Sequence, residues 1–353
     1  DVLCDQRDYA TAKMAQSTAR QYGRRGALSE MYGVTNWDFD FRGHKLQGDW
    51  QAAMGITVRV HHVAWMSMRG EAKRDYPASI QYQSPWYKEY PLIEDHFARV
   101  NTAMTAGKGV ASIGVIHPIE SFWVVFGPKE LTFAKQNELE ENYRNITNWM
   151  LGGLLDFDFI SEALLAEQAK EAVRMENGKP LFVMGEMAYE TVILPGCHTL
   201  RSNTIRCLKE FAALGGRVLI LGRAPYLVDG ESAAPIDWPG AVKQMPFERA
   251  ALLEELEDIR QVDVRAKDGS RTENLVYQLR KAGNGIRYLF LAHATEHISH
   301  EFQDMVNSTD YPYVEPVTIS IRGKYKVKEM DTLSGSIKPY KAEIRKKGEE
   351  AWT

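Results

Sequence analysis

The sequence predicts an α/β protein, and three observations support that prediction. Short apolar, β-branched segments alternate with amphipathic helical patterns through much of the chain, which is typical of parallel sheets covered by helices. After residue 245 the pattern changes to period-2 segments separated by turn residues, which indicates antiparallel strands. The 353 residues, 44% of them hydrophobic, are enough for roughly two or three domains with buried cores. We therefore divide the chain into residues 1–107, 108–245 and 246–353.

In residues 1–107, the strand patterns are followed by polar and aromatic residues. Gly26–Glu30 predicts a buried strand that ends in a carboxylate, and Ile56–Val60 predicts a second strand that ends at two histidines. A helix predicted for 38–54 separates the two strands, and Gly55 ends it. The remaining predicted elements are helices at 11–22 and 93–105 and a loop at 77–91.

Residues 108–245 alternate more regularly between strand and helix patterns. Strands are predicted at 112–116, 157–160, 191–194 and 218–221, and helices at 129–150, 162–176 and 202–214. Strand–helix alternation of this kind predicts a parallel sheet with helices on both faces.

Residues 246–353 begin with an acidic helix predicted for 247–259. Period-2 strands are predicted after it at 275–279, 286–291, 317–321 and 325–330. Turn signals such as Gly283-Asn284-Gly285 separate them, so we expect an antiparallel β region.

Composition and charge exclude several classes of function. The chain has 43 Lys and Arg against 47 Asp and Glu, a net charge of −4, so we expect no nucleic-acid partner. No apolar run reaches about 18 residues, so no membrane span is predicted. The cysteines Cys4, Cys197 and Cys207 are widely spaced, which favours neither a disulfide framework nor a zinc cluster. The glycine-rich phosphate fingerprints are absent as well, and we predict no cofactor.

Two predicted strand ends form the strongest candidate site. Glu30 and His61 are 31 residues apart, about the length of one strand–helix–strand unit, so both are expected at the carboxyl ends of neighbouring parallel strands. Aromatic residues such as Trp37 lie nearby, and an aromatic ring beside a carboxylate suits a sugar. The alternative is that Glu30 is a surface residue and His61 a hydrogen-bonded core histidine. His61 and His62 point to opposite faces of a strand, which disfavours a shared metal ion, and no metal site is predicted.

A series of short motifs in this region resembles the last strands of known glycoside hydrolase barrels. The motifs are Leu28-Ser29-Glu30-Met31-Tyr32-Gly33, Trp37, Gly48-Asp49-Trp50, Gly55-Ile56-Thr57 and His61-His62. Their order is similar to the clan of family 42 and family 35 β-galactosidases and to bacterial α-L-rhamnosidase-like glycosidases. The resemblance implies that residues 1–107 are the C-terminal part of a catalytic (β/α)8 TIM-like barrel. Glu30 matches the catalytic glutamate at the end of the seventh strand, as nucleophile or general base.

The resemblance also implies which residues hold the carbohydrate substrate. Lys73-Arg74-Asp75-Tyr76-Pro77 and Ser84-Pro85-Trp86 are similar to the loop that closes the sugar site. The expected sugar contacts are Trp37, His61, His62, Asp75 and Trp86.

Glycoside hydrolysis usually needs two carboxyl groups that flank the bond, and this chain offers one strong candidate, Glu30. In the resembled clan the acid/base lies at the end of the fourth strand, and a whole barrel takes about 250 residues. We therefore expect the second carboxylate upstream of residue 1, in a longer natural chain, and we expect the isolated chain to be inactive. Glu71 and Asp75 are the alternatives within the chain. A processed signal peptide would also explain the start at Asp1, so the localisation, cytoplasmic or secreted, is left open.

Motifs in the second region resemble the middle domain of family 42 β-galactosidases. They are Val192-Ile193-Leu194-Pro195-Gly196, Thr199-Leu200, Leu208-Lys209-Glu210-Phe211 and Gly215-Gly216-Arg217-Val218. The resemblance implies a flavodoxin-like, amidotransferase-like fold for 108–245 and a homo-oligomer formed through it. It implies a linker helix and part of a β-sandwich for 246–353.

The nucleophile position of amidotransferase-like folds falls at Gly222, so this domain is expected to lack a catalytic thiol, and Cys197 is interpreted as a loop residue. The function indicated is an O-glycosidase acting on poly- or oligosaccharides. The alternative is a non-catalytic glycan-binding or oligomerisation module.

Overall fold

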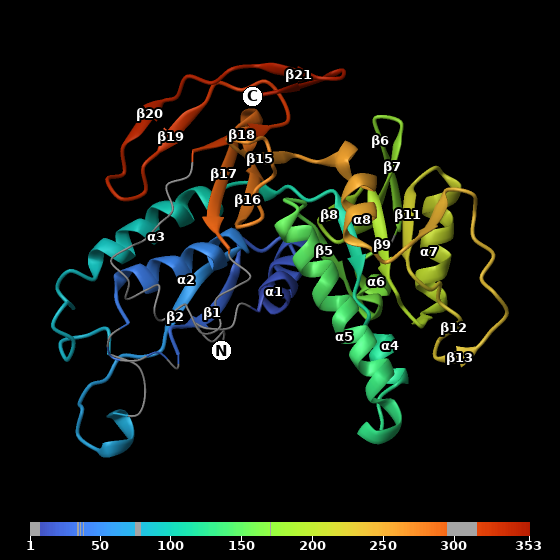
Figure 1. Ribbon diagram of the computed structural model, residues 1–353, viewed down its shortest axis with the longest axis horizontal. Helices are drawn as coiled ribbons and strands as arrows, with labels where there is room; N and C mark the ends of the chain where they lie inside the picture. The colour runs from blue at the N-terminus through green and yellow to red at the C-terminus, as the bar shows by residue number, and fades with distance from the viewer. Residues whose placement is uncertain are drawn as a thin grey trace. The chain divides into compact units, whose positions relative to one another are not determined.

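The computed structural model describes residues 8–33, 35, 37, 39–74, 79–169, 171–294 and 316–353. These residues form two compact units (Figure 1). Unit 1 contains the described residues of 1–12, 25–109 and 260–353, and unit 2 contains those of 13–24 and 110–259. The division into three domains stays a prediction. No helix in the described ranges is long and apolar enough to cross a membrane.

Unit 1 combines a parallel strand pair, the helices beside it and several antiparallel strands. Its elements up to residue 109 are β1 (Ala27–Met31), α2 (Phe41–Ala53), β2 (Ile56–His61), the 3-10 helix η1 (Glu71–Arg74), α3 (Pro91–Met104) and β3 (Lys108–Gly109). Its later elements are β15 (Val262–Ala266), β16 (Leu275–Lys281), η3 (Gly283–Gly285), β17 (Arg287–His293), β18 (Val317–Ile321), β19 (Lys328–Met330), β20 (Ile337–Pro339), β21 (Arg345–Lys347) and β22 (Glu350–Trp352).

Helix α2 connects β1 to β2, which lie side by side and parallel, as the 31-residue spacing predicts. Asp40 caps α2, since its side chain accepts hydrogen bonds from the backbone N–H groups of Arg42 and Gly43. Inside α2, Gly48 permits a close approach to α3, because a Cβ atom there would lie 2.1 Å from Cζ of Phe97. The described residues contain no closed barrel, so membership of a barrel is taken up below as a proposal.

The later strands of unit 1 form small antiparallel sheets. β15 pairs with β18, and β16 pairs with β17 and with the short β3. The turn predicted at Gly283-Asn284-Gly285 joins β16 to β17, and Asn284 has a φ of 61° there. An antiparallel β region is therefore present, and its description as part of a sandwich stays a prediction.

Unit 2 is built around a five-stranded parallel sheet, in the spatial order β14-β11-β9-β4-β5. Helix α1 (Tyr9–Gln21) begins in unit 1 and continues into unit 2. The elements that follow are β4 (Ile113–Ile116), α4 (Ile119–Val124), α5 (Lys129–Gly152), β5 (Asp158–Ile160), α6 (Glu162–Gln168), β6 (Val173–Glu176), β7 (Lys179–Met184), β8 (Met187–Tyr189) and β9 (Thr191–Pro195). The chain continues with β10 (Thr199–Leu200), α7 (Ser202–Ala213), β11 (Arg217–Leu221), β12 (Leu227–Val228), β13 (Glu231–Ser232), β14 (Val242–Met245), α8 (Arg249–Glu255) and η2 (Glu257–Ile259).

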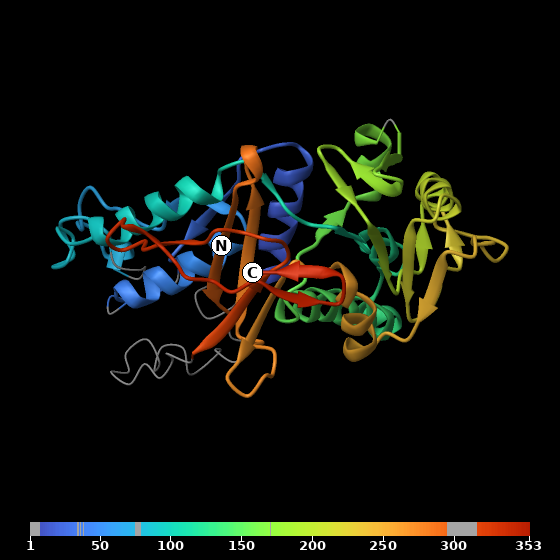
Figure 2. The same cartoon turned by 90° about the horizontal axis from the view of Figure 1, so that it is seen from above.

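The sheet of unit 2 has helices on both faces, as the alternating pattern predicts. Helices α5 and α8 lie on one face, and α7 lies on the other (Figure 1, Figure 2). All five residues of β9 are buried, as are Val218–Leu221 of β11. Near-continuous apolar strands of this kind are typical of parallel sheets covered on both sides.

A buried ionic cluster joins α1 to the strand β5 within unit 2. The Arg20 guanidinium donates to Asp156 (Nη2 to Oδ2, 2.7 Å) and to Asp158 (Nη1 to Oδ1, 3.0 Å). Lys13, fully buried, forms an ion pair with Asp156 as well. Burial alone would raise the pKa of the Asp156 carboxyl, but the charges of Arg20 and Lys13 outweigh it and lower the pKa. The two basic side chains therefore favour the ionised form of the buried Asp156 carboxyl.

One predicted helix is shorter than expected. The pattern of 162–176 predicts a single helix, whereas α6 ends at Gln168 and Val173–Glu176 is strand β6. The reason lies in the next two residues, because Asn177 and Gly178 have positive φ angles of 51° and 78° and form the turn between β6 and β7. Asn-Gly is a strong hairpin signal, and the hairpin overrides the local helix propensity.

Candidate active site

The candidate site lies at the carboxyl ends of β1 and β2 in unit 1. In the register of the two strands, Glu30 is opposite Val60 and Met31 is opposite His61. Side chains alternate between the faces of a strand, and paired residues of parallel strands lie on the same face. Glu30 therefore shares a face with Val60, and His61 shares the other face with Met31. The two predicted site residues lie at the same end of the strand pair but on opposite faces of it.

The face that carries Glu30 is exposed in the described structure. Leu28, Val58 and Val60 belong to it and are 60%, 51% and 42% exposed, and Glu30 at its carboxyl end is exposed as well. The exposed face of a half-buried strand usually carries polar residues. Apolar residues next to a carboxylate at the strand end indicate, by contrast, a strand that is covered on both faces. We name these four residues, Leu28, Glu30, Val58 and Val60, the open face.

The opposite face of the strand pair is covered by helices of unit 1. The guanidinium carbon of Arg59 lies 3.9 Å from the centre of the Phe97 ring of α3. Asn101 of α3 donates a hydrogen bond of 2.9 Å to the backbone oxygen of Thr57. Met31 is fully buried in a cluster with Phe39 of the loop that follows β1. The strand pair therefore has helix contacts on one side and the open face on the other.

His61 takes part in an ion-pair network on the helical side. Its Nε2 atom lies 3.0 Å from Oε1 of Glu94, and Arg59 Nη2 donates to Oε2 of the same carboxylate at 2.8 Å. Partial burial of Glu94 would raise its pKa, but the hydrogen bond from His61 and the charge of Arg59 reverse the effect and lower the pKa. Tyr32 extends the network, because its hydroxyl accepts from Arg59 Nη1 at 3.1 Å. The sequence signal for this network is Arg59, since a charged residue within an apolar strand needs a buried partner.

Trp86 packs against other aromatic rings on the same helical side. Its ring centre is 5.3 Å from that of Phe41, 5.5 Å from that of Tyr90 and 5.7 Å from that of His44. His44 is buried below these rings, and burial lowers its pKa to about 4, so it is neutral at pH 7. The structure thus brings Trp86 and His61 together around Tyr90, away from the face of Glu30.

The other expected sugar contacts lie in loops or just beyond a strand. Trp37 is 39% exposed in the loop that follows β1. His62 follows the last residue of β2, and its backbone N–H donates to the Met31 oxygen at 2.8 Å. The alternation along β2 predicts that His62 lies on the Glu30 side. Asp75 lies outside the described residues.

Two further expectations concern residues that could bind a metal or act as a nucleophile. In the described part of the chain, no group of three or more His, Cys, Asp and Glu residues is arranged to hold a metal ion. In unit 2, Cys197 is buried, and burial raises the pKa of its thiol, which disfavours the reactive thiolate.

Comparison with solved structures gives the fold that this arrangement belongs to. The chain is similar to the rhamnosidase from Novosphingobium sp. PP1Y, with a TM-score of 0.64 and 15% identity over 98% of this chain and 31% of that one. It is also similar to α-L-fucosidase isoenzyme 2 from Paenibacillus thiaminolyticus, with a TM-score of 0.50 and 11% identity over 99% of this chain and 60% of that one. No known family model matches the sequence, and no curated protein is similar to it in sequence. The chain therefore has a mixed α/β, glycosidase-like fold and spans about a third of the rhamnosidase.

Proposed function

We propose that the chain is part of an O-glycosidase in which Glu30 is one of the two catalytic carboxyl groups. The observation that supports this most directly is the position of Glu30, at the carboxyl end of a parallel strand and on the open face. In (β/α) barrels the helices lie outside, and the catalytic residues come from the carboxyl ends of the strands. The alternative sequence interpretation, that Glu30 is an ordinary surface residue, does not account for the apolar Leu28, Val58 and Val60 beside it.

In this proposal, β1 and β2 are the last two strands of a (β/α)8 barrel, and other strands of a longer protein cover the open face. The second carboxylate belongs to one of those strands. Its distance from Glu30 decides the outcome, since about 5–5.5 Å gives retention and about 6.5–9.5 Å gives inversion of configuration. The strand order of unit 2, with β4 and β5 followed by β9, β11 and β14, supports the flavodoxin-like assignment of the second region.

The proposal divides the predicted sugar contacts into two groups. Trp37, His62 and Asp75 are kept as residues that contact the carbohydrate. His61 and Trp86 are given a positioning role, because their described contacts are with Glu94 and with aromatic rings on the helical side. A homo-oligomer formed through residues 108–245 remains a prediction, and light scattering would test it.

The test is hydrolysis of aryl glycosides by the full-length protein. The panel contains aryl α-L-rhamnosides and α-L-fucosides, because rhamnose and fucose appear in the names of the similar structures. It also contains aryl β-D-galactosides, because the sequence motifs resemble those of β-galactosidases. Glu30→Gln should lower kcat/KM by at least about 100-fold, the usual contribution of a catalytic acid or base. The matched control is Glu89→Gln, an exposed glutamate of the same unit on the loop before α3.

Three results separate the possibilities. A loss of activity in Glu30→Gln but not in Glu89→Gln supports the proposal. Activity of Glu30→Gln within about threefold of the wild type, a difference below 1 kcal/mol in the barrier, removes Glu30 from the mechanism. Wild-type protein that hydrolyses none of the glycosides, yet binds a glycan, favours the alternative of a non-catalytic glycan-binding module.

A further inference from the structure

The sheet of unit 2 reverses its strand order between β4 and β9. After β4 the chain continues to β5 on one side, and it then adds β9, β11 and β14 on the other side. In open parallel sheets, a crevice forms outside the carboxyl ends of the strands at such a reversal, and ligands bind there. The topology therefore favours a ligand site at the carboxyl ends of β4 and β9 in unit 2.

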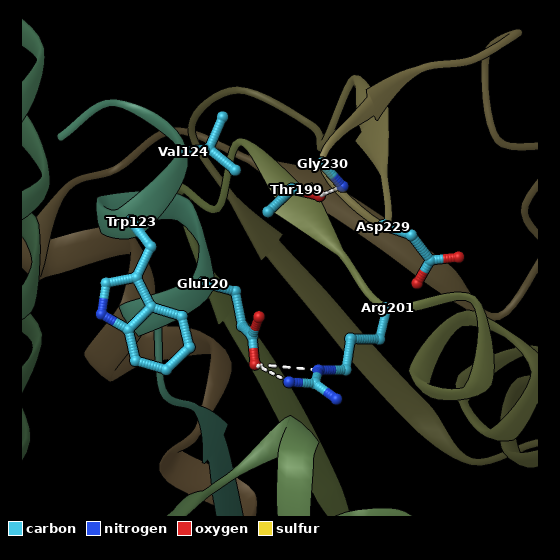
Figure 3. Close-up of a pocket in the computed structure, with 7 residues that line it drawn as sticks. All are labelled: Glu120, Trp123, Val124, Thr199, Arg201, Asp229 and Gly230. Atoms are coloured by element: carbon cyan, nitrogen blue, oxygen red, sulfur yellow. Dashed lines mark hydrogen bonds and ion pairs between the residues drawn. The ribbon is translucent and has the colours of Figure 1, made fainter. Parts of the chain in front are cut away.

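A cavity of about 230 Å³ lies where the topology predicts it (Figure 3). Its lining comes from α4, which follows β4, from the segment after β9 and from the turn after β12. The lining residues are Glu120, Trp123, Val124, Thr199, Arg201, Asp229 and Gly230. Pockets for drug-sized ligands are usually about 300–1,000 Å³, so this cavity suits one small ring.

Hydrogen bonds between distant segments fix the walls of the cavity. The Ser121 hydroxyl of α4 accepts from the backbone N–H groups of His198 at 2.9 Å and of Thr199 at 3.2 Å. The Thr199 hydroxyl in turn accepts from the Gly230 N–H at 3.0 Å. These bonds tie α4, the segment after β9 and the turn after β12 together. A ligand would therefore enter a largely preformed site, which lowers the entropic cost of binding.

The polar part of the cavity pairs an acceptor with donors. Arg201 donates from Nη2 at 2.7 Å and from Nε at 2.8 Å, and both bonds reach Oε1 of Glu120 (Figure 3). No hydrogen bond from the described residues reaches Oε2 of Glu120. The Glu120 side chain is 16% exposed and that of Arg201 is 41% exposed, so both still reach solvent in the cavity. Neighbouring hydroxyls of a sugar match this pair, since one donates to a carboxylate and the next accepts from a guanidinium.

The remaining lining selects a neutral ligand with an apolar face. Trp123 is 59% exposed and lies beside Glu120 in the cavity (Figure 3), where its ring offers a flat surface for stacking. Glu120 and Asp229 carry two negative charges against the single positive charge of Arg201, so phosphates and carboxylates are repelled. We propose that this cavity is a non-catalytic binding site for a single neutral saccharide unit. The site does not depend on the role of Glu30.

The test measures binding of small methyl glycosides to the whole chain by saturation-transfer NMR. The probes are methyl β-D-galactopyranoside, methyl α-L-rhamnopyranoside and methyl β-D-glucopyranoside, with inorganic phosphate as the anionic probe. At least one glycoside should bind and phosphate should not. Trp123→Ala should weaken binding by at least about tenfold. The matched control, Phe126→Ala, removes a ring that is 72% exposed just after α4 but does not line the cavity, and should leave affinity unchanged.

Two further variants keep the result interpretable. Glu120→Gln keeps the size of the side chain and removes its charge, so it should weaken binding without the loss of packing that Trp123→Ala brings. Glu30→Gln should bind the glycoside as the wild type does, even where it abolishes hydrolysis, so that failure of the proposed active site leaves the binding result at the cavity unchanged. The proposal is overturned if no glycoside binds, if phosphate binds instead, or if binding survives Trp123→Ala. A change in molecular mass of Trp123→Ala by light scattering also overturns it, because Trp123 would then contact a second copy.

Discussion

Replacing Arg20 with methionine tests the buried ionic cluster of unit 2. The guanidinium pairs with both Asp156 and Asp158, and its side chain is only 4% exposed. Methionine fills similar space but leaves Asp156 and Asp158 without the guanidinium that pairs with both. Breaking a buried ion pair by removing one partner costs about 3–5 kcal/mol, and we expect unit 2 to lose that much stability.

Amide hydrogen exchange followed by mass spectrometry measures this loss unit by unit. Peptides that cover β4 and β9 should exchange roughly 100-fold to several thousand-fold faster in Arg20→Met, because each 1.4 kcal/mol is a factor of ten. Arg174→Met is the matched control, since Arg174 pairs with Glu176 at an exposed position of the same unit. Its cost should be about 0–1 kcal/mol. Equal exchange in the two variants would refute the view that Arg20 stabilises the buried carboxyl groups of unit 2.

Two other predictions concern packing and pH. Gly48→Ala should destabilise unit 1 by about 1–3 kcal/mol, because the new Cβ would meet the Phe97 ring. In the control Gly283→Ala no atom lies within 4 Å of the new Cβ, so the stability should change little. Equal urea midpoints of the two variants would contradict this prediction. Burial raises the pKa of Glu162 from 4.5 to about 7, so the folded state binds the proton of this carboxyl more tightly than the unfolded state does. The stability gained from the bound proton is complete below pH 4.5 and declines as the pH rises to 7. Glu162→Gln should remove that decline from the exchange of unit 2, and an unchanged pH profile would exclude Glu162 as its source.

Much of the secondary structure could be predicted from local patterns. The strand Ile56–Val60 and the helix 202–214 have strong periodicity and appear in the structure within one or two residues. The parallel pairing of β1 and β2 followed from the spacing of 31 residues alone. The helix predicted for 162–176 was wrong in its second half. The prediction followed the local helical pattern, whereas in the structure the Asn177-Gly178 turn makes Val173–Glu176 a strand.

The candidate site was harder to predict than the strands, for a physical reason. Spacing along the sequence correctly predicts which strand ends lie together. Which residues share a face of the strand pair depends on the pairing register, and a single sequence does not specify that register. A shift between Ala27 and Leu28 in the pairing with β2 illustrates this. The contact of His61 with Glu94 joins residues 33 positions apart through an intervening loop, and no local pattern predicts it. The cavity of unit 2 was also missed, since its lining comes from three separate segments.

The residues of β1 and β2 that contact α3 lie on the face opposite to Glu30. Substitutions at Val58 or Val60 would reshape the surroundings of Glu30 without touching the ion pair between Arg59 and Glu94 that holds α3. A library restricted to alternate positions of these strands would therefore vary the surroundings of Glu30 while the contacts with α3 stay intact. Substitutions on the open face should therefore cost little stability, whereas substitutions on the face that contacts α3 should cost more.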